Sequence, residues 1–380
     1  MMKIGEIVLM SICSKRLSCL VKLGRYQLHD LLIHLKPGNL QIEVNRTSKD
    51  YCDIFFNSTG NVPKGCDSLS QWFENGNSDI LNFTATDSIE DVFSVCNRLR
   101  SDFRVTYFFW KLFPEDHRNL REFISTLDFD TCSRVYIVGG KVNISSLSFL
   151  IDRMSFKNSM TLTSNISYKF THPRALDFTS IEYEDARWLK VSDLKSIRNG
   201  SFVDVTGRTN FDNHDINALI KYWTECKEKM FLRLRIKLKD GIRINVSRIL
   251  KGVVSCTSGG RYFFIAKKLI QTHSFGYVEF TDGLVTLTTG AFASQLNLLI
   301  PVLKLLEQES DLTIKYSELV KKERELHARP QNEEGENDSE QEILKIEAEK
   351  RNVQTELNEI NEKLEHYQVK NINSHLVPID

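Results

Sequence analysis

Residues 105–154 read VTYFFWKLFPEDHRNLREFISTLDFDTCSRVYIVGGKVNISSLSFLIDRM, and this stretch decides the expected fold. Val105–Trp110 and Arg134–Val138 are short runs of β-branched and aromatic residues, which favour strands. Leu120–Leu127 and Ile144–Met154 place apolar residues three and four positions apart, as an amphipathic helix does. Strand-like and helix-like segments therefore alternate, and this alternation predicts an α/β fold.

The same rhythm continues toward the C-terminus. Further strand-like runs are Met160–Thr163, Ser180–Tyr183, Ser201–Val205 and Leu232–Leu238, and a further helix-like run is His214–Trp223. Successive strands lie roughly 20 to 30 residues apart, an interval typical of one strand–helix unit in a leucine-rich-repeat-like solenoid. The leucine-rich consensus is absent, so an ordinary α/β domain with short crossovers is the alternative. The interval favours an irregular leucine-rich-repeat-like strand–helix scaffold.

The segments outside this region have other patterns. Ile4–Leu35 has the apolar spacing of helices and ends at Pro37-Gly38, and Leu40–Val44 alternates like a strand. After Leu250 the pattern predicts three strands, with Thr281-Asp282-Gly283 as a hairpin turn. These strands are Tyr262–Ala266, Tyr277–Phe280 and Leu284–Thr288.

The C-terminal part has the heptad spacing of coiled coils. In its first arm, Leu305, Leu312, Leu319 and Leu326 are seven residues apart, with Glu309 and Glu323 on the complementary seam. In its second arm, one seam is Ile346, Val353, Ile360 and Tyr367, and the other is Ile343, Leu357 and Leu364 with Lys350 interrupting it. Residues 328–340 predict a flexible acidic loop. An antiparallel hairpin and a homodimer through residues 341–367 are both open.

Composition restricts the class of protein. The 380 residues include 50 basic and 50 acidic side chains, with 41% hydrophobic and 26% charged residues, as in globular proteins. The charge balance disfavours nucleic-acid binding, and no apolar run is long enough to cross a membrane. Eight scattered cysteines and the lack of a recognisable signal peptide favour a reducing compartment, in the cytoplasm or nucleus. Eight N-x-[ST] tripeptides leave a secreted, disulfide-bonded binding protein as the less favoured alternative.

No stretch predicts an enzyme. The phosphate-binding, nucleophile-elbow and zinc-protease motifs are absent, so we expect no catalytic residues, cofactor or metal. Gly139-Gly140-Lys141 is better explained as a turn, and Asp212 or Asn213 as the cap of the helix that follows. Trp72, Trp110, Trp188 and Trp223 could anchor a partner, although core packing is the commoner role of tryptophan.

Two stretches resemble a known family. Met2–Lys22 resembles the second half of an F-box from the nematode-expanded group of F-box proteins, without the opening half of that motif. A longer stretch, 186–287, is similar to the type 2 F-box-associated domain. The matching residues in the first stretch are Glu6, Ile7, Leu9, Ser11, Cys13, Ser14, Lys15, Arg16, Leu20, Val21 and Lys22. Those in the second are Ala186–Leu189, Asp193, Leu194, Asp215–Asn217, Ile220–Trp223, Leu232, Leu234, Ile236, Ile249–Gly252, Asp282, Gly283 and Thr286.

The resemblance implies a non-catalytic adaptor, a substrate receptor of an SCF-type cullin–RING ubiquitin ligase. Ile7, Leu9 and Leu20 would contact the Skp-type adaptor, weakly because the F-box is incomplete, and the associated domain would bind an unknown substrate protein. A scaffold or dimerising relative that has lost ligase docking is the alternative. The expected domains are a partial F-box at 1–25, an α/β repeat-like domain at 26–299 and a helical tail at 300–370.

Overall fold

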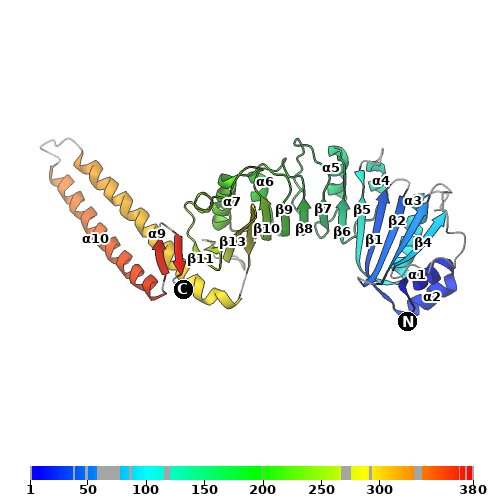
Figure 1. Ribbon diagram of the computed structural model, residues 1–380. Helices are drawn as coiled ribbons and strands as arrows, with labels where there is room; N and C mark the ends of the chain where they lie inside the picture. The colour runs from blue at the N-terminus through cyan, green and yellow to red at the C-terminus, as the bar shows by residue number, and fades with distance from the viewer. Residues whose placement is uncertain are drawn as a thin grey trace. The chain divides into compact units, whose positions relative to one another are not determined.

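Figure 1 shows the computed structural model of the chain. It describes residues 2–36, 39–47, 50–57, 78–84, 88–114, 120–198, 200–266, 275–290, 293–328, 336–367, 369–372 and 375–378. The chain forms two compact units, of which the first comprises 1–190 and 199–210 and the second comprises 191–198 and 211–380. The division therefore falls inside the single domain expected at 26–299.

The first unit begins with two short helices, α1 (Ile4–Cys13) and α2 (Lys15–Gly24). An antiparallel meander follows, made of β1 (Gln27–Lys36), β2 (Asn39–Thr47) and β3 (Asp50–Asn57). The edge strand β4 (Ser78–Thr84) runs parallel to β3 and leads into α3 (Ser88–Asp102). Ile4, Ile7 and Val8 of α1 are buried, and α1 and α3 pack on one face of this meander.

The helical expectation for Ile4–Leu35 is correct only as far as α2. Residues 27–36 form a strand, because Leu31, Ile33 and Leu35 alternate on the buried face. Leu32 interrupts this alternation with an apolar residue on the other face, and that mixture also fits helical spacing. A short apolar run of this kind does not distinguish the two structures.

The rest of the first unit is a ladder of parallel strands in sequence order, as Figure 1 shows. The strands are β5 (Arg104–Leu112), β6 (Arg134–Ile137), β7 (Ser159–Leu162), β8 (Ser180–Tyr183) and β9 (Gly200–Val205), with β5 beside β1. The helix α4 (Leu120–Thr126) lies between β5 and β6 in the chain, and α5 (Ile144–Arg153) lies between β6 and β7. The expected strands and helices of this region are confirmed.

The second unit contains an antiparallel sheet. The helix α7 (Asn213–Glu225) is contacted by two short helices, α6 (Val191–Lys195) before it in the chain and α8 (Val246–Ile249) after it. The sheet order is β10 (Phe231–Lys237), β14 (Leu284–Thr289), β13 (Phe275–Thr281), β12 (Arg261–Ile265) and β11 (Cys256–Ser258). The last two strands of the chain, β15 (Val369–Ile372) and β16 (His375–Pro378), pair with each other, and β16 also pairs with β11.

Two long helices, α9 (Ala293–His327) and α10 (Glu336–His366), form an antiparallel hairpin in the second unit. Leu319 and Leu326 of α9 pack with Ile346 and Val353 of α10, so the expected seams meet within one chain. Two of the three expected seam defects also meet, because Lys350 Nζ lies 2.7 Å from Glu323 Oε2. The base of the hairpin packs on Phe263 and Tyr277 of the sheet. The predicted loop 328–340 lies partly outside the described residues, and its last five residues belong to α10.

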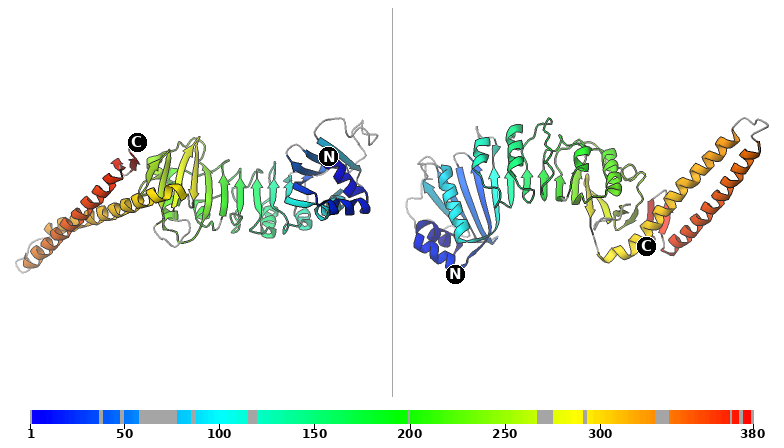
Figure 2. Two further views of the ribbon diagram at one scale, coloured as in Figure 1. Left: turned by 90° about the horizontal axis from the view of Figure 1, so that it is seen from below. Right: turned by 180° about the vertical axis from the view of Figure 1, so that it is seen from behind.

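The chain is thus a mixed α/β protein with a large, mostly parallel set of strands in its first unit. Two views from other directions show the same order of strands (Figure 2).

Candidate functional site

Trp188 and Leu189, two of the residues that carry the resemblance, belong to the core of the first unit. Trp188 is 6% exposed, and its ring meets Phe170 and Tyr183 edge-on with centroids 4.7 and 5.2 Å away. The Tyr183 hydroxyl donates to the Ala175 carbonyl at 2.8 Å, and Leu189 is buried beside this group. Burial raises the pKa of Tyr183 above its ordinary value. These residues form a core and not a surface.

The polar motif residues of the second unit satisfy backbone groups at helix ends. Asp215 completes a capping box with Asp212, whose carboxylate accepts from the backbone amides of His214 and Asp215. The buried Asn217 amide donates to the carbonyls of Ile249 and Lys251 at 2.7 and 2.9 Å. The expected helix cap is confirmed, and the hydrogen bonds of these side chains serve the backbone at helix ends.

Two further residues that carry the resemblance, Asp193 and Leu194, lie in α6. Asp193 lies in the first turn of α6, where its backbone carbonyl accepts from Ser196, and Leu194 is 1% exposed.

The remaining motif residues shape turns and the core of the second unit. Trp223 is 4% exposed and meets Phe264 edge-on at 5.3 Å. Asp282 and Gly283 both have positive φ, as a two-residue hairpin turn between twisted strands requires. Gly252 has φ of 68° just after α8. The expected hairpin turn is therefore confirmed.

The proposed adaptor contacts lie in different environments. Ile7 is 2% exposed and contributes to the core of the first unit, so its side chain is covered by the chain itself. Leu9 is half-buried, whereas Leu20 on α2 is 56% exposed. Leu23, which the sequence did not single out, is 77% exposed and lies three residues further along the same helix. A partner docking on these helices would meet Leu20 and Leu23.

A second surface lies on the strands of the first unit. In β5 and β6, buried Phe108, Trp110, Val135 and Ile137 alternate with residues that point the other way. We call the side away from α1, α3 and α5 the outer face. On the ladder it comprises Tyr107, Phe109, Lys111, Arg134, Tyr136, Ser159, Thr161, Ser180, Glu182, Phe202 and Asp204.

Aromatic rings gather on the outer face at β5 and β6. Tyr107 and Phe109 stack at 6.1 Å, and Phe109 meets Tyr136 edge-on at 5.9 Å. The Arg134 guanidinium lies 5.8 Å from the Tyr136 ring. Tyr107 and, further along the ladder, Phe202 are each 45% exposed. Large aromatic side chains that are nearly half exposed, with a guanidinium nearby, are typical of protein-binding surfaces.

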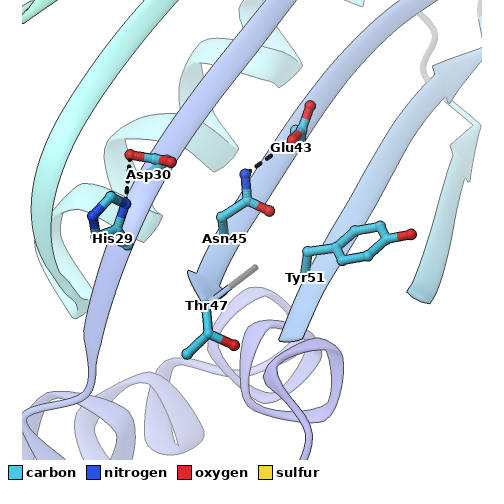
Figure 3. Close-up of a pocket in the computed structure, with 6 residues that line it drawn as sticks. All are labelled: His29, Asp30, Glu43, Asn45, Thr47 and Tyr51. Carbon is cyan, nitrogen blue, oxygen red and sulfur yellow. Dashed lines mark hydrogen bonds and ion pairs between the residues drawn. The ribbon is translucent and has the colours of Figure 1, made fainter. Parts of the chain in front are cut away.

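The outer face continues onto the meander, where it becomes acidic. A cavity of about 570 Å³ is lined by six residues of β1, β2 and β3, which Figure 3 shows: His29, Asp30, Glu43, Asn45, Thr47 and Tyr51. We call it the acidic cavity, because two of the six are carboxylates and none is a lysine or an arginine. Asn45 Nδ2 donates to Glu43 Oε1 at 2.9 Å, and His29 Nδ1 lies 2.9 Å from Asp30 Oδ1.

Two neighbouring carboxylates beside the cavity have opposite pKa shifts. The hydrogen bond from His34 lowers the pKa of Glu43 below its ordinary value, against an opposing effect of burial. Burial raises the pKa of Asp53, although Gln41 donates to it at 2.9 Å. Glu43 and Asp53 stand directly opposite each other on β2 and β3. The pair concentrates negative charge on this end of the outer face.

The sequence did not identify the outer face as a site. Its aromatic residues alternate with equally aromatic core residues in VTYFFW, so period-two patterning does not tell which set points outward. Trp110, one of the four candidate anchors, is 2% exposed and belongs to the core, where its Nε1 donates to the Asp128 carbonyl at 3.1 Å. Trp72 lies outside the described residues.

Cysteines and possible metal ligands add no second site. Cys19, Cys52, Cys96, Cys132, Cys226 and Cys256 carry free thiols. Burial raises the pKa of Cys96, Cys132 and Cys256 to about 12. Within the described ranges, no three histidine, cysteine or acidic residues are grouped to hold a metal ion. No described helix combines the length and apolarity needed to span a membrane.

The chain matches no known family model, no curated protein and no solved structure.

Proposed function

We propose that the chain is a non-catalytic protein-binding adaptor, whose partner lies along the outer face of the first unit. The observation that carries this proposal is a cluster of aromatic rings on that face, in which the exposed Tyr107 adjoins the half-buried Phe109 and Tyr136, with Arg134 beside Tyr136. Tyrosine, phenylalanine and arginine are enriched at protein interfaces, where rings bury large apolar areas with few rotatable bonds.

The parallel ladder gives this cluster a rigid support. The inward residues of β5 and β6 are buried, so the outward residues hold fixed spacings across the strands. A preordered surface loses little conformational freedom on binding, and this favours affinity. An irregular leucine-rich-repeat-like scaffold would use its strand face in this manner.

The resemblance makes the proposal more specific. We propose a substrate receptor of an SCF-type ligase inside the cell, in which the outer face holds the substrate and α2 contacts the Skp-type adaptor through Leu20 and Leu23. Catalysis would belong to other subunits. A scaffold without ligase docking is the second candidate, and homodimerisation would require the hairpin to open, because Ile346 and Val353 already pack against α9.

Site-specific photo-crosslinking in cells tests the first part. A benzophenone amino acid replaces Tyr107 or Phe202 on the outer face, and Phe156, which is 60% exposed outside that face, serves as the matched control. We expect a protein crosslinked from positions 107 and 202 and not from 156. The purified partner should then lose affinity for a Tyr107→Ser, Tyr136→Ser variant. Equal crosslinking from all three positions would refute the outer face as the binding surface.

Calorimetry with a Skp-type adaptor tests the second part. We expect binding weaker than micromolar, lost in a Leu20→Asp, Leu23→Asp variant, with each covered leucine worth about 1.5–3 kcal/mol. Ile7→Ala is not a useful docking probe, because it opens the core of the first unit. Submicromolar affinity would contradict weak docking, and complete absence of binding would favour the scaffold without ligase docking.

A further inference from the structure

The acidic cavity is open to the outer face, and the permanent charges that line it are all negative. Asp30 and Glu43 contribute carboxylates from neighbouring strands, and none of the six lining residues carries a permanent positive charge. Arg46, which follows Asn45 in β2, is already paired with Asp50 at 3.4 Å. The charge of Lys111 contributes to lowering the pKa of Glu43. The Nζ of Lys111 also lies 5.7 Å from the centroid of the Phe113 ring, where it makes a cation–π contact. The two cavity carboxylates are therefore met by the His29 and His34 rings and by the charge of Lys111, and within the described part of the chain no lysine or arginine lines the cavity itself.

The neighbouring acids add to this negative charge. Glu43 and Asp53 are cross-strand partners, and like charges directly opposite on adjacent strands destabilise a sheet. Their described hydrogen-bond donors are the Asn45 and Gln41 amides and the His34 ring. A cation bound at the cavity would relieve this repulsion.

Aromatic groups beside the carboxylates select the kind of cation. Tyr51 lines the cavity, and Asp30 stands in register with Tyr107, whose ring meets His29 at 5.4 Å. A lysine or arginine side chain has a methylene stem that packs on rings and a charged end that carboxylates hold. A calcium ion would instead need six to eight oxygen ligands, and among the described residues no three histidine, cysteine or acidic side chains are grouped to hold a metal ion.

We propose that the acidic cavity receives the side chain of a lysine or arginine from the bound protein. The inference rests on the proposed function and specifies the partner's chemistry.

The strand register also predicts where an apolar residue of the partner lies. Glu43, Leu32 and Phe109 are in register on β2, β1 and β5. Two strand spacings separate Glu43 from Phe109, which is about 10 Å. An extended chain covers that distance in about three residues. The bound segment should therefore carry a basic residue with an aromatic or aliphatic residue about three positions away.

Selection from a random dodecapeptide library displayed on phage tests this inference with the full-length chain. We expect the selected peptides to share a lysine or arginine at this spacing from an apolar residue. The best peptide is then synthesised with its arginine or lysine, and again with citrulline or norleucine in that place. Its affinity should fall at least tenfold with an Asp30→Asn, Glu43→Gln variant, whereas the uncharged peptide should bind both proteins alike.

Matched variants separate the outcomes. Asp130→Asn, Asp177→Asn removes the same charge from exposed sites outside the outer face and should leave affinity unchanged. Thermal unfolding of each variant verifies that it is folded. An equal loss with this control would overturn the inference, because the effect would then be general electrostatic attraction.

Two further results distinguish the inference from the function beneath it. Peptides that lose affinity with Tyr107→Ser, Tyr136→Ser, but show neither a basic residue nor any effect of Asp30→Asn, Glu43→Gln, would overturn the cavity's role alone. If no selected peptide depends on any outer-face residue, the proposed binding surface itself is wrong.

Discussion

Replacing Trp223 by alanine should destabilise the second unit without touching a binding surface. The ring is 4% exposed and lies on the same face of α7 as Ile216 and Leu219, which are fully buried. Truncating a buried tryptophan typically costs about 3–5 kcal/mol. The second unit has about 180 residues, and for that size the loss lowers its melting temperature by about 6–20 °C. Lys221→Ala, on the exposed side of the same helix, should have little effect.

The glycine beneath the ring makes the test sharper. A Cβ added at Gly276 would lie 3.2 Å from Trp223 Cη2, 3.1 Å from Phe264 Cε2 and 3.3 Å from the Thr288 carbonyl oxygen. Overpacking of this kind costs about 1–3 kcal/mol. In a Trp223→Ala background the Phe264 ring gains room to move aside, so Gly276→Ala should cost less there. The double variant should therefore lose less free energy of unfolding than the two single variants lose together, and the difference should be about 0.5–3 kcal/mol.

Urea unfolding of the four proteins, with calorimetry in parallel, measures this coupling. Additivity within about 0.5 kcal/mol would show that Trp223 does not determine the need for glycine at position 276. A Trp223→Ala protein with unchanged melting but lost partner binding would refute the reasoning altogether, because Trp223 would then be an interface anchor.

Three other predictions follow from particular contacts. Glu323→Lys should loosen the α9–α10 hairpin by facing Lys350 with a second ammonium, and adding Lys350→Glu should restore slow hydrogen exchange in α10. Burial alone would raise the pKa of Asp102, but hydrogen bonds from Ser11 and Ser18 lower the pKa below its ordinary value. Its stabilising effect should therefore be complete above about pH 4 and be lost as pH falls through the lower folded-state value, and Asp102→Asn should flatten that acid limb of a pH–stability curve. A thiol reagent should react with eight thiols in the denatured protein, and a smaller number would favour the secreted alternative. In the native protein, Cys19→Ser should remove one equivalent from the fast phase of the reaction, because Cys19 is exposed.

Periodicity predicted most strands and helices, and its failures have local causes. The ladder strands were recoverable because each is a β-branched or aromatic run bounded by turn residues, as at Arg134–Val138. Residues 27–36 were misassigned because Leu31, Leu32 and Leu35 also fit helical spacing, and only their partners decide. The strands β3, β4 and β11, the final pair β15–β16 and the helix α3 were not predicted. Strand pairing is a non-local property, and short polar segments carry little signal of it.

The hairpin shows a similar limit on a smaller scale. Glu323 and Lys350 each place a charge in an otherwise apolar seam, and the sequence therefore left the dimer and the hairpin both open. The contact between them, across 27 positions, converts two flaws into one ion pair. Charge patterns within a single helix do not reveal such compensation, because its register is set by the turn between the arms.

The residues that carry the family resemblance and the residues that would carry binding are different sets. Trp188, Asn217 and Trp223 are buried, and they pack cores or satisfy backbone carbonyls. Tyr107 and Tyr136 lie on the outer face and play no part in the resemblance. A scaffold held by the first set tolerates change in the second, since outward residues on a strand ladder contribute little to the core. The first set therefore holds the fold, whereas under the proposed function the chemistry that selects a partner belongs to the acids and rings of the outer face.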